Sequence, residues 1–557
     1  MLSETFTLQE KTLGRMLDEV VSRFPDREAV IYFDTGVRQT WAEFSRDADA
    51  LAKGLTAFGV SRGAKIGIWA PNVPHWLTLM FAAARIGAVL VTVNTSYGGR
   101  ELAYFLKQSD CDTLFLAHTY KDHNFLNILE SVVPELRERP SDDLRSAGFP
   151  FLRRVFLMEE EGAAGIMGLS RVTERAGSVS DADYAARQAA VAPHDVVQMQ
   201  YTSGTTGFPK GVMLSHVNIQ NNGWWIGRNM RFTAEDRLCL CVPLFHCFGS
   251  VLGVMAAVNH CASLVIIDAF NPLKVLDAIQ KERCTAVHGV PSMYLAMMDH
   301  KRFPRYDLTS LRTGIMAGSV CPPPLMRRAV AEMYLKDLTN CYGLTEASPV
   351  MTQTTADDDF ARKTETVGRP MPGIDVLIAD PRALPGRTLE MPRGTPGEVV
   401  CRGYNVMKGY YKMPEETKEV VNADGWLRTG DVGIMDEKDY VIINGRIKDM
   451  IIRGGENIYP REIEDFLLEM DKISDVQVVG VRSRRYGEDV VAFIIPREGV
   501  TLTRKEVRAY CKGRIAWHKV PRFMAFVDSF PMTGSKKIRK YALREEAERL
   551  FAAAAAR

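Results

Sequence analysis

The sequence has no apolar run long enough to cross a membrane. Its best candidate, residues 77–93, is interrupted by Arg85 and Gly87, whereas a spanning helix needs about 20 mostly apolar residues. Residues 1–11 also lack the basic stretch and apolar core of a secretory signal. We therefore expect a cytoplasmic protein without a transmembrane segment, and a peripheral contact with a membrane stays open.

An excess of charge of one sign is also missing. The 70 basic and 68 acidic residues leave a net charge of +2, so nucleic acid is not an expected partner. The ten cysteines contain no C-x-x-C pair. This pattern disfavours zinc sites and disulfides and indicates small buried thiols in a reducing compartment. The chain does not end in S-K-L, which argues against a peroxisomal address.

Length and pattern predict at least two domains, because 557 residues are too many for one core. Helical patterns alternate with short β-rich runs over most of the first 333 residues, as in largely parallel sheets. Residues 134–190 are expected to form an irregular connection. A compact α+β segment follows residue 446. The expected fold is therefore α/β plus α+β, with a large N-terminal domain (1–445) of mixed, largely parallel sheets and flanking helices, and a smaller C-terminal domain (446–557).

The periodicity places individual elements. Helices are expected at 13–24, 41–58, 73–86, 101–108, 272–283, 325–333, 461–469 and 504–514. Strands are expected at 29–33, 65–70, 89–93, 113–117, 196–201, 238–242, 263–267, 285–287, 311–317, 440–444, 476–481, 490–495 and 522–527. Gly59 stands where a helix C-cap glycine belongs.

Residues 201–211 read Tyr-Thr-Ser-Gly-Thr-Thr-Gly-Phe-Pro-Lys-Gly. Backbone N–H groups freed by glycine, hydroxyl donors and an ammonium are what a polyphosphate needs. A Walker loop would place lysine beside its last glycine with a hydroxyl after it, but here Pro209 precedes Lys210 and Gly211 follows it. The stretch predicts a phosphate loop of another kind, with a surface turn as the alternative. Its binding residues are Thr202, Ser203, Gly204, Thr205, Thr206, Gly207 and Lys210.

This stretch resembles the signature loop of the adenylate-forming superfamily, which comprises acyl- and aryl-CoA synthetases, luciferases and peptide-synthetase adenylation domains. Further segments resemble that family's motifs in the same order: 243–249 (Pro-Leu-Phe-His-Cys-Phe-Gly), 316–323 (Met-Ala-Gly-Ser-Val-Cys-Pro-Pro), 340–348 (Asn-Cys-Tyr-Gly-Leu-Thr-Glu-Ala-Ser), 429–431 (Thr-Gly-Asp) and 531–540 (Pro-Met-Thr-Gly-Ser-Lys-Lys-Ile-Arg-Lys). The resemblance implies ATP, Mg²⁺ and coenzyme A as cofactors and co-substrates.

The resemblance also implies roles for residues around the nucleotide. Tyr342 offers an aromatic face for adenine beside Gly343, and Thr345 a hydroxyl for the α-phosphate. Glu346 supplies a carboxylate for Mg²⁺, a hard cation that prefers oxygen. Thr202 is expected to act in catalysis as well as binding.

The resemblance implies two further sets of contacts with the nucleotide. The backbone at Gly318 and Ser319 lies against adenine and the acyl chain, although a plain strand-to-helix turn fits the same residues. Asp431 and Arg446 contact the ribose.

The C-terminal motifs imply a moving domain. Lys448 occupies the family's hinge position, and Gly454 and Gly455 resemble the loop that lines the pantetheine tunnel. Lys537 is expected to be the catalytic lysine that bridges α-phosphate and substrate carboxylate. Lys536 stands where the family has glycine, so the choice between Lys536 and Lys537 stays open.

His246 resembles the family's residue beside the acyl site and is expected to form a wall or gate of the substrate pocket; a structural histidine is the alternative. Trp224, Trp225, Gly289 and Val290 line the same pocket or belong to the core.

The whole pattern is most similar to medium- and long-chain fatty acyl-CoA synthetases. The expected enzyme is an AMP-forming acid–thiol ligase of lipid metabolism: carboxylate plus MgATP gives acyl-AMP and pyrophosphate, and CoA then gives acyl-CoA and AMP. The chain ends soon after the lysine motif, which favours a free-standing enzyme over a peptide-synthetase module. The alternatives are an aryl-CoA ligase, a luciferase-like oxidase and a non-catalytic nucleotide-binding protein. Dimers are common in the family, so a homodimer is one alternative.

Overall fold

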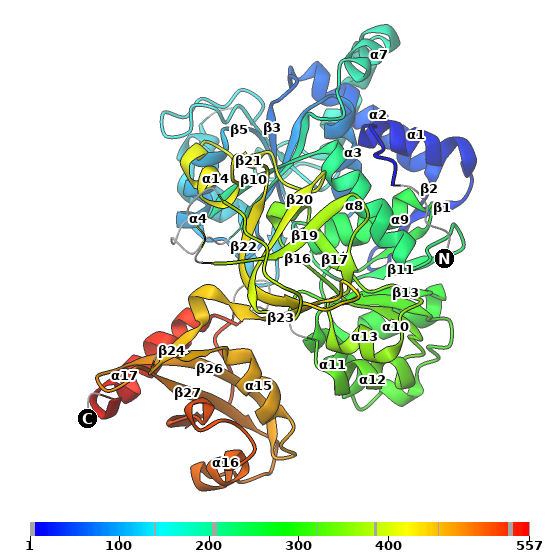
Figure 1. Cartoon of the computed structure of the whole chain (residues 1–557). Coiled ribbons are helices and arrows are strands. Elements are labelled where there is room, and N and C mark those ends of the chain that lie inside the picture. Colours follow the sequence, from blue (N-terminus) through cyan, green and yellow to red (C-terminus); the bar gives the residue numbers. More distant parts are fainter. Residues whose placement is uncertain are drawn as a thin grey trace. The chain divides into compact units, whose positions relative to one another are not determined.

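The computed structural model describes residues 6–138, 141–202, 209–319, 321–381, 383, 387–454, 456–532 and 538–555. The chain forms two compact units (Figure 1). The first contains residues 1–376 and 401–427, and the second contains residues 377–400 and 428–557.

One seven-stranded sheet of the first unit has the order β15-β14-β13-β11-β12-β1-β2. Every neighbouring pair is parallel except β1 and β2, which pair antiparallel. The strands are β1 Glu28–Tyr32, β2 Val37–Thr40, β11 Arg237–Leu240, β12 Ser263–Ile266, β13 Ala286–Gly289, β14 Thr313–Met316 and β15 Asp337–Thr339. Because parallel strands share one direction, the loops that follow β11, β13, β14 and β15 leave the same edge.

Helices α10 (Pro272–Glu282), α11 (Pro291–Met298) and α12 (Pro323–Glu332) pack against strands of this sheet (Figure 1). Each begins with proline in its first turn, where the missing N–H has no helical partner to lose.

The second sheet has the order β21-β10-β9-β4-β3-β5-β8. Its strands are β3 Lys65–Trp69, β4 Val89–Thr92, β5 Cys111–Leu116, β8 Arg154–Leu157, β9 Val196–Thr202, β10 Lys210–Ser215 and β21 Gly409–Tyr410. Strands β9 and β10 pair antiparallel, with Lys210 opposite Thr202. The predicted phosphate loop therefore connects the two strands of a hairpin.

The remaining helices of the first unit cover both sheets or connect them. They are α1 Leu13–Arg23, α2 Trp41–Ala57, α3 Trp76–Arg85, α4 Gly99–Ser109, α5 Phe125–Val132, α6 Leu169–Thr173, α7 Asp181–Ala189, α8 His216–Asn229, α9 Ala256–Asn259, α13 Phe360–Glu365 and α14 Pro414–Val420. Segment η3, Phe248–Met255, is a π-helix and is entirely buried. Short strands complete this unit: β6 Thr119–Tyr120, β7 His123–Asn124, β16 Cys341–Gly343, β17 Val350–Gln353 and β18 Arg369–Pro370.

The second unit contains a five-stranded sheet, in which β25-β24-β27-β26 are joined by β28 alongside β27. Helices α15 and α17 pack against β26, and apolar side chains such as Val476, Val491 and Phe493 fill the space between them. Its elements are β24 Ile451–Arg453, β25 Glu456–Ile458, α15 Pro460–Leu468, β26 Ile473–Ser483, β27 Gly487–Pro496, α16 Arg504–Cys511, β28 Phe523–Phe526 and α17 Lys540–Ala555. A four-stranded sheet precedes them: β19 Ile374–Ala379, β20 Gly397–Gly403, β22 Leu427–Met435 and β23 Val441–Arg446.

The expected fold class is confirmed, and the expected elements occur with ends shifted by a few residues. Gly59 has a φ of +79°, as a C-cap glycine requires. Strand β10 and the π-helix were not expected. The two units meet at 376/377, 400/401 and 427/428 along the chain. The predicted boundary at 445/446 is that of a moving C-terminal domain, and it stays a prediction.

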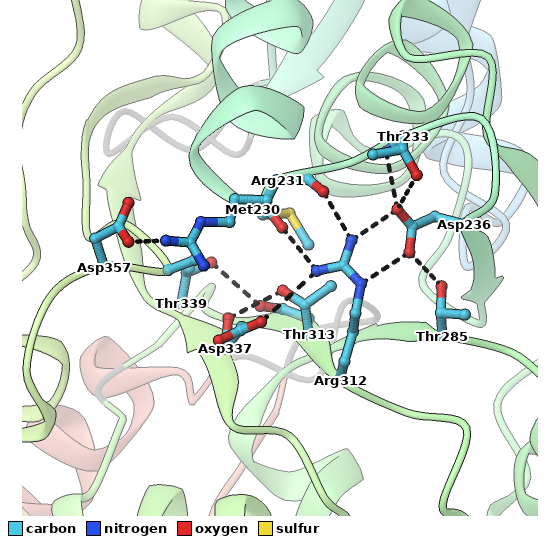
Figure 2. A network of polar contacts seen from close by, with 12 residues as sticks. Met230, Arg231, Thr233, Asp236, Thr285, Arg312, Thr313, Asp337, Thr339 and Asp357 are labelled. Atoms are coloured by element: carbon cyan, nitrogen blue, oxygen red, sulfur yellow. Dashed lines mark hydrogen bonds and ion pairs between the residues drawn. The ribbon is translucent and has the colours of Figure 1, made fainter. Parts of the chain in front are cut away.

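A charged network holds the amino edge of the first sheet (Figure 2). Asp236, Thr285 and Arg312 directly precede β11, β13 and β14. The Asp236 carboxylate, only 3% exposed, accepts hydrogen bonds from Arg312 Nη2 at 2.7 Å, Arg312 Nε at 3.1 Å and Thr285 Oγ1 at 2.6 Å. These bonds join three neighbouring strands at the edge opposite to the one their following loops leave.

Asp236→Ala is expected to lower the free energy of unfolding by about 3 kcal/mol, because it leaves the Arg312 guanidinium without its buried partner. Urea unfolding followed by tryptophan fluorescence measures the change. Asp357→Ala is the matched control, since Asp357 pairs with Arg231 at the surface of the same network (Figure 2) and its loss should cost no more than about 0.5 kcal/mol. Equal losses in the two variants would contradict this account of the network.

Candidate active site

The predicted site residues of the first unit gather where parallel strands end. His246 follows β11, Val290 follows β13, Gly318 follows β14, and the segment with Thr345 and Glu346 follows β15. Ligands of α/β proteins bind outside the carboxyl ends of parallel strands. The topology thus brings four distant segments of the sequence to one edge.

Gly318 lies against two of these neighbouring loops. Its φ is +86°, a conformation that side chains disfavour, and a Cβ placed there would lie 3.1 Å from Val290 Cγ1 and 3.8 Å from the Phe248 ring. Gly318 and Ser319 are exposed. The absence of a side chain therefore permits a tight turn whose backbone remains accessible to a ligand.

The loops that carry His246 and Thr345 meet at Cys247. The Cys247 thiol lies 3.5 Å from His246 Nδ1 and 3.7 Å from Thr345 Oγ1. His246 Nδ1 also accepts a hydrogen bond from the Phe248 N–H at 3.2 Å. Because Nδ1 accepts, a neutral His246 carries its proton on Nε2.

The two ends of the predicted phosphate loop are fixed by the β9–β10 hairpin. Thr202 and Lys210 are partners in the register, and both are partly buried. Ser203, Gly204, Thr205, Thr206 and Gly207 lie outside the described residues.

Glu346 is held through both its backbone and its side chain. The Met407 N–H donates to the Glu346 carbonyl at 2.9 Å, and the Tyr410 hydroxyl donates to Glu346 Oε1 at 2.8 Å. The Lys210 ammonium lies 4.9 Å from the centre of the Tyr410 ring. Tyr410 therefore contacts both a cation and an anion of the predicted site, although nothing in its sequence surroundings indicated this role.

The residues present fit a magnesium ion that is bound mainly through a nucleotide. Glu346 provides a hard carboxylate oxygen, and among the described residues no group of three or more His, Cys, Asp or Glu side chains could hold a metal ion. Mg²⁺ commonly takes one or two carboxylates plus substrate phosphates rather than a cage of protein ligands.

Buried amide side chains hold the backbone around Glu346 in place, and two of them belong to α8. Asn222, fully buried, donates to the Val350 carbonyl at 2.8 Å and accepts from its N–H at 3.1 Å. Asn218 donates to the Val406 carbonyl at 3.2 Å. Asn405 in turn donates to the Ala347 carbonyl at 3.1 Å, directly beside Glu346. The run of amides in an otherwise apolar helix was the signal that could have revealed these contacts.

The second unit brings together the predicted ribose-binding pair. Asp431 and Arg446 face each other across β22 and β23, with 2.9 Å between Arg446 Nε and Asp431 Oδ1. Burial, with a smaller effect of the Arg446 charge, lowers the pKa of Lys448. The Lys448 carbonyl accepts from Arg544 at 3.3 Å.

Gly454 has a φ of +62°, and its N–H donates to the Tyr486 carbonyl at 2.7 Å. The preceding Arg453 is buried in an ion pair with Asp489, at 3.0 Å between Nε and Oδ1, so the strand before the glycine is firmly anchored. Gly455, Lys536 and Lys537 lie outside the described residues.

Trp224 and residues of α1 line a cavity of about 380 Å³. None of the residues predicted to bind the nucleotide or the metal ion lines this cavity. Trp225 is buried and packs near Phe6, with 6.4 Å between ring centres. Among the described residues, no helix is long and apolar enough to cross a membrane.

The chain matches the family described as AMP-binding enzyme over residues 17–411, and the AMP-binding enzyme C-terminal domain over residues 462–537. It belongs to the AMP-binding enzyme family.

Similar sequences cover nearly all of this AMP-binding enzyme. The protein named "Putative acyl-CoA synthetase YngI" of Bacillus subtilis is 47% identical over 544 residues, which are 98% of each chain. The mitochondrial medium-chain acyl-CoA ligase ACSF2 of Homo sapiens is 39% identical over 548 residues, 97% of this chain and 88% of that one.

Solved structures share the fold over the same span. ATP-bound MatB from Rhodopseudomonas palustris has a TM-score of 0.81 at 27% identity, covering 97% of this chain and 99% of that one. A Mycobacterium tuberculosis fatty acyl CoA synthetase has a TM-score of 0.72 at 27% identity, covering 97% and 98%. These findings confirm the predicted superfamily and the class of enzyme, an AMP-forming acid–thiol ligase of the acyl-CoA synthetase type that uses ATP, Mg²⁺ and CoA.

Gly318→Ala is expected to lower kcat/KM by about tenfold or more, because the new methyl group strains the turn and pushes it away from Val290. Steady-state release of AMP measures the effect. Gly36→Ala is the control: Gly36 has a similar φ of +74°, but no atom of the described residues lies within 4 Å of the place its methyl group would take. Unchanged kinetics in the Gly318 variant would show that this turn does not touch the reacting groups.

Proposed function

We propose that this AMP-binding enzyme activates a medium- or long-chain fatty carboxylate with the residues gathered at the carboxyl edge of the first sheet. The observation that carries the proposal is the convergence of the Lys210 hairpin, Glu346 and the His246 loop through Tyr410 and Cys247. Triphosphate and carboxylate are both anions, so a site that joins them must supply cations, N–H groups and hydroxyls together.

Each residue group has a distinct task in the proposal. Thr202 to Gly207 and Lys210 bind the phosphates, Thr345 donates to the α-phosphate, and Tyr342, Gly343, Gly318 and Ser319 surround adenine. Glu346 holds Mg²⁺, which neutralises phosphate charge when bound. His246 borders the acyl group at the point where the π-helix begins. Asp431 and Arg446 bind the ribose hydroxyls.

The proposal includes movement of residues 446–557 about Lys448. Adenylation needs Lys537 at the α-phosphate, whereas thioester formation needs that lysine withdrawn and a path for the pantetheine thiol past Gly454 and Gly455. The conformational freedom of Gly454, which has a positive φ, supports a close approach of this loop to pantetheine.

The aliphatic preference is supported by the names of the relatives, medium-chain acyl-CoA ligase and fatty acyl CoA synthetase. A panel of acids from acetate to palmitate, with benzoate, tests it through AMP release in the presence of ATP and CoA. The highest kcat/KM is expected among the medium- and long-chain acids. A clear preference for benzoate would favour the aryl-CoA ligase alternative, and absence of turnover with every acid would favour a non-catalytic nucleotide-binding protein.

We further propose a cytoplasmic location. The ten cysteines support it, because among the described residues they form no disulfide and thiols persist in a reducing compartment. A homodimer and a peripheral membrane contact are separate hypotheses. Sedimentation velocity and flotation with phospholipid vesicles test them.

Lys537→Ala is expected to lower adenylation at least about a hundredfold, because the ammonium that joins the two anions is lost. Thioester formation from supplied acyl-AMP should be nearly unchanged. Exchange of pyrophosphate into ATP measures the first step, and CoA consumption measures the second. Lys536→Ala is the matched control and should retain both. The opposite pattern would identify Lys536 as the catalytic lysine, and full exchange activity in both variants would refute the assignment.

A further inference from the structure

Tyr410 joins two predicted site residues that the sequence places far apart. Its hydroxyl donates to Glu346 Oε1 at 2.8 Å, and the face of its ring lies 4.9 Å from the Lys210 ammonium. A phenol is able to make both contacts at once, because its oxygen bonds an anion while its ring face attracts a cation.

The backbone around Tyr410 is fixed independently of these two contacts. Val212 of β10 is the register partner of Tyr410 in β21, and the Lys408 N–H donates to the Met213 carbonyl at 2.9 Å. The Tyr410 N–H donates to Thr417 Oγ1 at 2.9 Å. The segment is therefore bound to the strand that begins at Lys210, and it carries the phenol to a fixed place.

The phenol acts as a neutral donor. The Tyr410 hydroxyl donates its hydrogen bond to Glu346 Oε1, and a phenol carries its proton at neutral pH. It can therefore satisfy one Glu346 oxygen without bringing a positive charge to the carboxylate.

The neutral character of the Tyr410 hydroxyl is important, because a lysine and a glutamate in one site tend to form an ion pair when no ligand separates them. Such an ion pair would have to be broken before a phosphate could use the lysine and a metal ion the carboxylate. A neutral group that contacts both charged side chains satisfies each without neutralising either.

We propose that Tyr410 is a positioning residue that orients the Glu346 carboxylate for Mg²⁺ and keeps it apart from Lys210. The inference rests on the proposed role of Glu346 as the metal ligand. It assigns to the segment at 407–410 a function in metal binding that is additional to its structural pairing with β10.

The test measures metal affinity directly on the full-length protein. Mn²⁺ replaces Mg²⁺ and is titrated by electron paramagnetic resonance in the presence of α,β-methylene-ATP. Calorimetry in EDTA measures the affinity of the same nucleotide without metal. Tyr410→Phe keeps the ring beside Lys210 and removes only the hydroxyl. Tyr410→Leu removes the ring as well.

Tyr411→Phe is the matched control. Tyr411 is the adjacent residue, and its hydroxyl also donates to a carboxylate, that of Asp110 at 2.8 Å, outside the predicted site. Both substitutions thus remove one phenol-to-carboxylate bond, and only one of them affects Glu346.

Tyr410→Phe is expected to weaken Mn²⁺ binding about tenfold while leaving the metal-free nucleotide affinity within about twofold. Tyr411→Phe should change neither, and Tyr410→Leu should weaken the metal-free affinity as well, because Lys210 loses its ring contact. Wild-type Mn²⁺ affinity in Tyr410→Phe, or equal losses with and without metal, would overturn the proposal. So would a Tyr411→Phe variant as impaired as Tyr410→Phe.

A fourth variant separates this inference from the function on which it rests. Glu346→Gln should weaken Mn²⁺ binding more than Tyr410→Phe does. If Glu346→Gln leaves Mn²⁺ affinity unchanged, the assignment of Glu346 as metal ligand fails. If Glu346→Gln is impaired and Tyr410→Phe is not, only the positioning role of Tyr410 fails.

Discussion

The shared direction of β11, β13, β14 and β15 is the constraint on which the site depends. Strands that run in parallel have their following loops at one edge, so the strand directions bring together segments up to a hundred residues apart. The charged network of Asp236 and Arg312 at the other edge holds the same strands in register. The charged network that stabilises the sheet and the predicted site residues thus lie at opposite ends of the same strands.

A second level of organisation comes from buried polar side chains. Asn218 and Asn222 of α8 bond to backbone groups of two different segments, and Asn405 extends the network to the residue after Glu346. Buried amides must be hydrogen-bonded to offset the loss of water, so each one specifies its partner as well as its own place. The backbone next to Glu346 is consequently held by buried amides that are not among the predicted site residues.

Most helices and strands and several site residues could be predicted from the sequence. The contacts between distant segments could not, for physical reasons. Periodicity gave the helices and parallel strands, since burial on one face repeats with the pitch of the element. The motif residues Glu346, Asp431 and His246 were predicted by resemblance, as was Arg446 as a second ribose contact. The ion pair between Asp431 and Arg446 was not predicted, because it depends on the pairing of β22 with β23. Tyr410 was not predicted, because its partners Lys210 and Glu346 are brought to it by strand pairing across the sequence. The π-helix at Phe248–Met255 was not predicted, because its apolar composition does not differ from that of a buried α-helix.

The π-helix has a consequence for how related enzymes diverge. A π-helical stretch contains more residues per turn than the α-helix that follows it at Ala256–Asn259, so it acts as a place where the chain accommodates an extra residue. Removing one residue from Phe248–Met255 would let this stretch return to α-helical geometry while the side chains before and after it keep their directions, because the wider turn already absorbs the extra residue. A single-codon deletion would in this way change the buried side chains that follow His246, the residue proposed to border the acyl group, without substituting any residue proposed to bind ATP.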